Sequence, residues 1–310
     1  MSGILRKAIW IVLLASVLGA AGCAAPQGEA GEREPDLRVA VTMGPEALPL
    51  LAAFEGGYFE DVLVEPVPVA GRGEALVLFQ SGAVDGGTGG LFTVAGLQGM
   101  GFLVFATSTS GADYILVTGP AEGEEGRPGP AVALREDQDE LYLLEALLEK
   151  LEAEPAEREY HFTRDSAQAL EALRLGHAGA AFLPRPAAEY TLPERAAISG
   201  STLEHDLPGG IIFFSGEALQ EKEPQIRAFY QGCRAAVQAL NDGEPAVLAP
   251  LVEKWGFPEA WREGLPFSLP GPRALTLDEA AAALAWLAAR EPDAAIPASE
   301  SLIWRSDLWE

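Results

Sequence analysis

Short apolar runs alternate with amphipathic segments along most of the chain after residue 36. Apolar runs bounded by Gly, Pro or polar residues predict strands, whereas apolar positions three and four residues apart predict helices. The expected strands cover residues 37–41, 62–69, 101–107, 114–118, 131–134, 160–162, 180–183 and 211–215. The expected helices cover residues 49–55, 73–80, 141–151, 167–175, 224–240, 245–255 and 277–290. This alternation predicts an α/β fold with mainly parallel sheets covered by helices.

Two segments of this pattern resemble each other. Residues 74–87 (EALVLFQSGAVDGG) and 168–181 (QALEALRLGHAGAA) each contain a helix that ends at a glycine, then three residues, then a strand of small residues. Asp85 in the first segment falls opposite Gly179 in the second. Either all βα units share this pattern, or the chain contains two similar lobes.

Composition excludes several classes of function. The chain has 310 residues, 46 acidic and 21 basic, with a net charge of −25, which argues against nucleic-acid binding and favours a soluble monomer. Two cysteines and three histidines without an HExxH pattern predict neither a disulfide scaffold nor a metal site. The glycine run at 86–90 is not GxGxxG and lacks GK[ST], so we expect no nucleotide cofactor.

The N-terminus has the pattern of an export signal. Arg6 and Lys7 precede an uncharged apolar run at residues 8–22, which is shorter than the roughly 20 residues that span a bilayer. Small residues come directly before Cys23. This order resembles the signal of bacterial lipoproteins, although Ala20 stands where leucine is usual. It predicts a signal peptide at 1–22, lipidation of Cys23, a flexible tether at 23–36 and an exported protein on the outer face of the cytoplasmic membrane or in the periplasm. An ordinary cleaved signal and an uncleaved anchor are the alternatives.

Four segments together resemble the type II periplasmic solute-binding proteins of ABC importers, in particular the sulfonate, nitrate and thiamine-precursor group. They are residues 44–67, 75–87, 172–190 and 209–245. Two departures concern the second lobe, where Gly179 replaces an acidic residue and Arg185 stands between two prolines at a variable position.

The resemblance implies a two-lobed clamp without catalysis. Lobe one would comprise residues 37–118 and 209–310, and lobe two residues 119–208, with the solute in the cleft between them. The implied partners are a small polar or anionic solute (sulfonate, nitrate or pyrimidine-like), an ABC permease and its ATPase, and the membrane through the lipid. Same-fold enzymes of the thiamine-pyrimidine or chorismate dehydratase type, and a sensory lipoprotein, are the alternatives.

Loops that follow strands supply the candidate ligand residues, because ligands of α/β sheets bind at the carboxyl ends of strands. In lobe one, hydroxyls and backbone amides are available at Thr42, Met43, Gly44, Pro45, Gly87, Thr88, Gly89, Thr107, Ser108, Thr109 and Ser110. In lobe two, the candidates are Ser166, Pro184 and Arg185, of which the arginine suits an anionic group. Cys233 lies on an apolar helical stripe, which predicts a buried, inert thiol.

Overall fold

The computed structural model describes residues 33–70, 72–107, 114–119, 131–135, 137–153, 159–185, 196–202, 204–205 and 207–304. The export signal, Cys23 and residues 24–32 of the tether lie outside these residues. In the part of the chain that is described, no helix is both long and apolar enough to cross a membrane.

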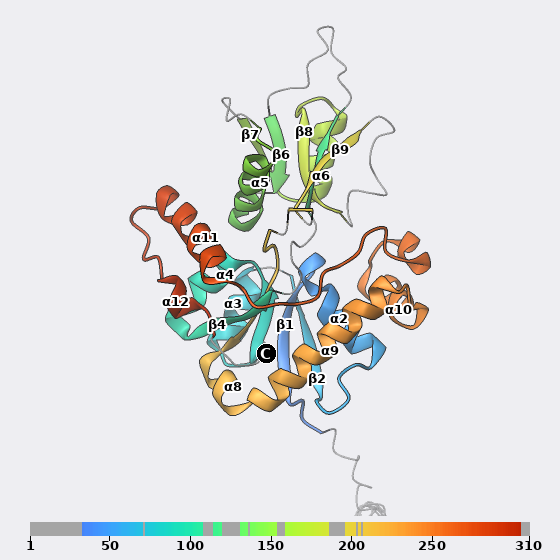
Figure 1. Ribbon diagram of the computed structural model, residues 1–310, viewed down its shortest axis with the longest axis vertical. Helices are drawn as coiled ribbons and strands as arrows, with labels where there is room; N and C mark the ends of the chain where they lie inside the picture. Colours follow the sequence, from blue (N-terminus) through green and yellow to red (C-terminus); the bar gives the residue numbers. More distant parts are fainter. Residues whose placement is uncertain are drawn as a thin grey trace, which may run out of the picture. The chain divides into compact units, whose positions relative to one another are not determined.

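The described strands form two five-stranded sheets, each covered by helices (Figure 1). The first sheet has the order β2-β1-β3-β10-β4. Its strands are β1 (Leu37–Thr42), β2 (Val64–Val69), β3 (Gly86–Gly89), β4 (Phe102–Thr107) and β10 (Ile211–Ser215). The second sheet has the order β7-β6-β8-β5-β9. Its strands are β5 (Tyr114–Thr118), β6 (Ala131–Arg135), β7 (Glu159–Thr163), β8 (Ala180–Pro184) and β9 (Ala197–Ser201).

Both sheets follow one topology. The first three strands in each order pair in parallel, and the fourth strand, β10 or β5, runs antiparallel to both of its neighbours. β3 and β8, which begin in the last two residues of the two similar sequence segments, occupy the same third position. The two segments therefore take equivalent places in two sheets of the same strand order.

One strand lies in a different sheet from the one expected. The expected boundary at residue 118 falls after β5, but β5 pairs with β8 and β9 in the second sheet. The chain therefore leaves the first sheet between Thr107 and Tyr114. The prediction missed this because an apolar run such as YILVT looks the same in either sheet.

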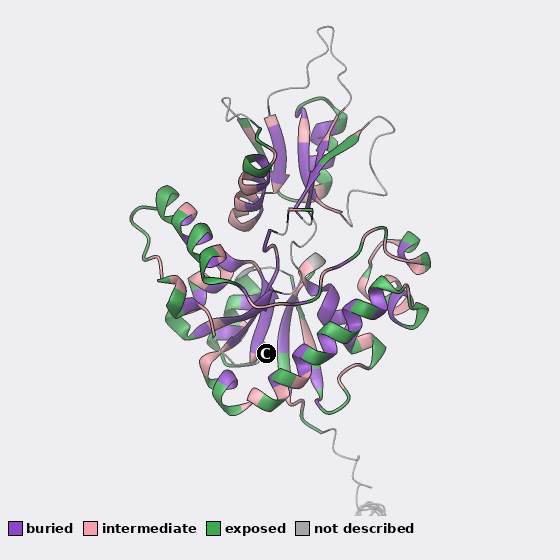
Figure 2. Cartoon of the chain, in the orientation of Figure 1, coloured by how far each residue is buried: buried purple, intermediate pink, exposed green. Residues whose placement is uncertain are grey.

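Helices cover both faces of the first sheet. One face packs on α2 (Leu48–Gly56), α9 (Glu223–Asn241) and α10 (Pro245–Trp255). The other packs on α3 (Arg72–Gln80), α4 (Leu91–Leu97) and α11 (Leu277–Arg290). Figure 2 shows the buried strands between these partly exposed helices. The capping box of Thr276 and Glu279 is present at the start of α11.

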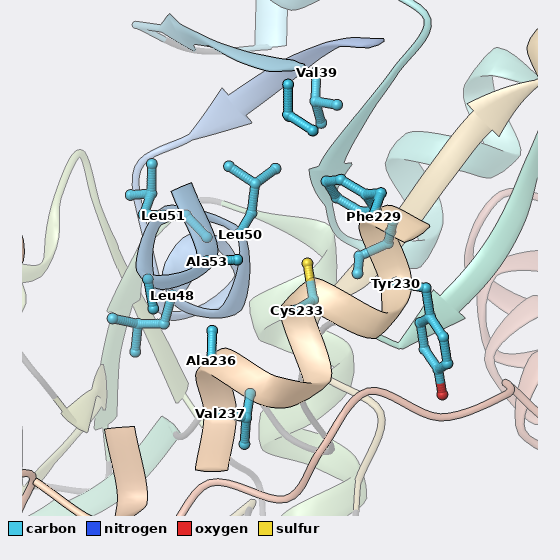
Figure 3. Close-up of a cluster of buried hydrophobic side chains, with 14 of the residues drawn as sticks. Val39, Leu48, Leu50, Leu51, Ala53, Phe229, Tyr230, Cys233, Ala236 and Val237 are labelled. Carbon is cyan, nitrogen blue, oxygen red and sulfur yellow. The ribbon is translucent and has the colours of Figure 1, made fainter. Parts of the chain in front are cut away.

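The core between α2 and α9 contains Cys233, which is fully buried (Figure 3). Burial raises the pKa of its thiol far above the ordinary range, so the expectation of a buried, inert thiol is confirmed.

The second sheet is smaller but is also covered on both faces. Leucines of α5 (Gln138–Lys150) pack on one face, and α6 (Ser166–Arg174) packs on the other. The shorter elements are α8 (Gly216–Glu221), α12 (Ser299–Leu302) and the 3-10 helices η1 (Pro45–Ala47), η2 (Gln98–Met100) and η3 (Glu259–Glu263).

Candidate functional site

A cavity of about 330 Å³ lies where the carboxyl ends of β1, β3 and β6 come together. Residues of both sheets line it, including Thr42 and Thr88 from the first and Arg135 from the second. The volume is at the small end of the range for ligand pockets, which begins at about 300 Å³. The position is the one that parallel sheets favour for ligands, because loops and helix starts gather there.

The first sheet supplies hydroxyl groups and apolar side chains to this cavity. Thr42 ends β1 and Met43 follows it, Thr88 and Gly89 end β3, and Phe79 of α3 contributes an aromatic ring. Thr88 is 3% exposed, and its Oγ1 makes no hydrogen bond to any described residue. A buried hydroxyl without a partner is costly, so a bound group that hydrogen-bonds to this oxygen would remove that cost.

Glu46 places a carboxylate on the same wall. It lies in η1, and its side chain folds over Gly44, where an added Cβ would lie 2.3 Å from a carboxylate oxygen. Desolvation raises the pKa of Glu46 to about 6. The hydrogen bond to its own backbone and the charge of Arg135 oppose this rise, whereas the charge of Asp137 adds to it.

The second sheet supplies charged groups through the loop between β6 and α5. Asp137 is the N-cap of α5 and accepts hydrogen bonds from the backbone N–H groups of Asp139 (2.9 Å) and Glu140 (3.2 Å). Asp137 therefore holds the start of α5, and with it Asp139, at the cavity.

Arg135 and Tyr114 both contact the buried carboxylate of Glu140. Arg135 Nη2 lies 2.9 Å from Glu140 Oε1 and 3.7 Å from Asp137 Oδ2. The Tyr114 hydroxyl donates to the same Glu140 oxygen at 3.1 Å. Burial raises the pKa of Glu140 to about 7, although the Arg135 charge opposes the rise. Arg135 Nε and Glu140 Oε2 make no hydrogen bond to the described residues.

Asp139 connects α5 to the first sheet's helix α4. Its Oδ1 accepts a hydrogen bond from the backbone N–H of Phe92 at 3.0 Å. A Cβ on Gly90 would lie 2.1 Å from Asp139 Oδ2, so glycine at this position leaves room for the carboxylate. The ring of Phe92 also packs against the rings of Tyr142 and Trp286, with 5.6 and 5.4 Å between ring centres.

Of the described residues predicted from the first half of the chain, some line the cavity and the others lie outside its lining. Thr42, Met43, Thr88 and Gly89 line the cavity. Gly44 lies beneath Glu46, and Pro45 begins η1. Gly87 packs against Phe213 and Phe79, whose ring atoms an added Cβ would approach to 3.0 Å.

Thr107 contacts a C-terminal segment instead. Its hydroxyl donates to the carbonyl oxygen of Arg273 and accepts from the backbone N–H of Arg273, both at 3.2 Å. Ser108, Thr109 and Ser110 lie outside the described residues.

The residues predicted from the second half do not line the cavity. Ser166 is the first residue of α6, after the N-cap Asp165. Pro184 ends β8, and the guanidinium of Arg185 lies 5.6 Å from the centre of the Phe267 ring.

The sequence reasoning instead overlooked Tyr114, Arg135, Asp137 and Asp139, together with Glu46 inside a loop it had selected. The sequence pattern could have identified the residues after β6, because residues 135–140 follow an expected strand and precede an expected helix, as residues 42–48 do.

No protein-family model matches the chain, and no curated protein matches it. Solved structures do match. The periplasmic aliphatic sulphonate binding protein SsuA from Escherichia coli has a TM-score of 0.67 and 13% identity, covering 88% of this chain and 99% of that chain.

Two further structures agree. A ligand-binding component of an ABC-type import system from Staphylococcus aureus, solved with zinc bound, has a TM-score of 0.67 and 12% identity, covering 88% and 97%. The alkanesulfonate-binding protein SsuA from Xanthomonas axonopodis pv. citri, bound to MOPS, has a TM-score of 0.63 and 17% identity, covering 87% and 98%. The chain therefore has the fold of the periplasmic solute-binding proteins of ABC importers.

Proposed function

We propose that this protein is the extracytoplasmic solute-binding component of an ABC importer. It captures a small polar organic solute and delivers it to a membrane permease that an ATPase drives. The observation that carries the proposal is the cavity lined by both sheets at the carboxyl ends of their strands. Its fold neighbours, which are components of import systems, support the same role.

Binding rather than catalysis is proposed for two reasons. The solved structures with this fold that are named above are binding components. In addition, two polar residues of the cavity, Tyr114 and Arg135, are held in place by contacts with Glu140 behind the wall. Such contacts fix the orientation of a ligand-binding wall.

Membrane attachment is proposed to occur through a lipid on Cys23, after removal of residues 1–22. The order of charged, apolar and small residues before this cysteine supports it. Metabolic labelling with a fatty-acid analogue should label the unaltered chain in bacterial cells, whereas Cys23→Ala should not be labelled. Equal labelling of both chains would contradict anchoring at this residue.

The experiment that tests solute binding is thermal unfolding of the full chain, purified in mild detergent, against a metabolite panel. The panel contains sulfonates, nitrate, pyrimidines, riboflavin-like heterocycles, amino acids and amines. A solute at about 100 times its Kd stabilises the folded state by about 2.7 kcal/mol. A clear rise in Tm with one class, without chemical conversion of that compound, is the expected result. Conversion of a panel compound would favour an enzyme, and no response from any class would favour a sensory role.

A further inference from the structure

The charges that line the cavity are predominantly negative. Glu46, Asp137 and Asp139 contribute carboxylates, and Arg135 contributes the positive charge among the described lining residues. The arginine is already engaged, because Glu140 lies 2.9 Å and Asp137 3.7 Å from its guanidinium. An anionic solute that approached Arg135 would therefore compete with two carboxylates of the protein.

Two backbone sites that could bind an anion are also occupied by the protein's own carboxylates. Asp137 accepts the first N–H groups of α5. Asp139 accepts the N–H of Phe92 at the start of α4, at 3.0 Å. Helix starts attract anions through these N–H groups, and here carboxylates of the chain already satisfy them. The charge that remains facing the cavity is negative.

Thr88 gives an independent indication that the cavity holds a solute. Its hydroxyl is buried, lines the cavity and makes no hydrogen bond to a described residue. A hydroxyl can accept a hydrogen bond from an N–H group. The aromatic rings of Phe79, Phe92 and Tyr114 also line the cavity, and aromatic rings attract organic cations.

We infer that the cavity takes a small organic cation, carrying an ammonium or amidinium group that faces Glu46 and Thr88. This inference rests on the proposed solute-binding function and replaces the polar or anionic solute that the sequence resemblance implied with a cationic one. The cation contacts the carboxylate wall, and its apolar part contacts the aromatic side chains.

The test uses two sets of probes that differ in charge but little in shape. The first set is benzamidine, benzamide and benzenesulfonate, and the second is butylamine, 1-butanol and butanesulfonate. Calorimetry and thermal unfolding of the full chain at pH 7.5 measure each affinity at low and at high salt. The cation of each set is expected to bind at least tenfold more tightly than its anion, with a smaller difference at high salt.

Three variants identify the groups responsible. Glu46→Gln should weaken cation binding at least tenfold. Thr88→Val should also weaken it but leave Tm unchanged or higher, because the hydroxyl that it removes has no partner in the described residues. Glu65→Gln is the matched control, since Glu65 lies on β2, pairs with Arg38 at 2.9 Å and does not line the cavity. It should leave cation binding unchanged.

The outcomes separate this inference from the function on which it rests. Tighter binding of the anion or of the neutral probe would overturn the cationic class and leave solute binding in place. Cation binding that Glu46→Gln and Thr88→Val leave unchanged would overturn this site. Absence of binding by all six probes would also overturn the inference, and the metabolite panel would then decide separately whether the protein binds solutes.

Discussion

The two sheets share one strand order but differ in the size of the side chains that face each other between the third and fourth strands. In the first sheet, Gly86 and Gly87 of β3 lie opposite Phe214 and Phe213 of the reversed strand β10. In the second, Ala180 and Ala181 of β8 lie opposite Thr118 and Val117 of the reversed strand β5. Small residues on one strand accompany large residues on its neighbour, so the same topology is kept at native packing density.

The sheets also differ at the carboxyl ends of their strands. The first contributes hydroxyls, apolar groups and the single carboxylate of Glu46, whereas the second contributes the charged groups of Arg135, Asp137 and Asp139. One topology can therefore carry two walls of different composition around one cavity. The four predictions below test this difference, in order of expected effect.

Gly86→Ala should be the most destabilising of these changes. Its Cβ would lie 2.2 Å from the backbone oxygen of Phe213, and backbone cannot move aside as a side chain can. We expect a loss of about 3 kcal/mol in the free energy of unfolding, measured by urea denaturation. Gly89→Ala is the control on the same strand, because the nearest atom is 3.7 Å away. Equal effects of the two variants would contradict the packing difference.

Glu140→Gln should flatten the dependence of stability on pH. The folded protein raises the pKa of Glu140 from its ordinary value of 4.5 to about 7. Its contribution is thus fully present below pH 4.5 and is lost as the pH rises through 7. This loss is about 3 kcal/mol, and the variant should not show it, because glutamine does not titrate.

The measurement is the free energy of unfolding of the parent and of the variant from pH 4.5 to 8. Their difference isolates the titration of Glu140 from that of its neighbours, which are Arg135, Asp137, Tyr114 and Glu46. Desolvation also raises the pKa of Glu46, to about 6, so Glu46→Gln should show a smaller change of the same sign. A parallel pH profile for Glu140→Gln and the parent would show that Glu140 titrates normally.

Asp85→Ala should cost about 1–2 kcal/mol, because Asp85 anchors the start of β3. It accepts from the backbone N–H of Arg38 at 2.8 Å and from Lys222 Nζ at 2.7 Å. Gly179 holds the equivalent position in the second sheet. The backbone N–H of Gly179 donates to the carbonyl oxygen of Ala131, and the backbone N–H of Asp85 likewise donates to the carbonyl oxygen of Arg38. Lys222→Ala removes the partly exposed ion pair alone and should cost less. A larger effect of Lys222→Ala would assign the anchoring to the ion pair.

Asp139→Ala should cost about 1 kcal/mol, since it removes the contact that caps α4 across the two sheets. The side chain of alanine at position 90 would collide with this carboxylate. Gly90→Ala should therefore cost less in the Asp139→Ala background than alone, as a double-mutant cycle by thermal unfolding would show. Additive destabilisation would mean that the side chains at positions 90 and 139 do not contact each other.

Local pattern predicted most elements well. Strands Tyr114–Thr118 and Ile211–Ser215 and helices Pro245–Trp255 and Leu277–Arg290 have the expected bounds. Proline cannot donate to a strand ladder and is therefore confined to edge strands; β2, which contains Pro66 and Pro68, is at the edge of its sheet. The prediction missed the helices α4, α8 and α12 and the strand β9. The strand β9 contains Ser199, Gly200 and Ser201, and such residues form a strand only where a neighbour such as β5 supplies the pairing.

The sequence by itself determined the α/β class, the export pattern, the negative charge and the cavity residues that directly follow β1 and β3. These features depend on residues close together in the chain, where periodicity and turn chemistry act. Tertiary structure decided which sheet takes β5 and that the segment after β6 lines the cavity. It also decided that carboxylates of the protein accept hydrogen bonds from the first backbone N–H groups of α4 and α5 at the cavity. These outcomes depend on contacts between residues far apart in sequence, because hydrogen bonding and desolvation at the cavity arise only when both sheets are in place.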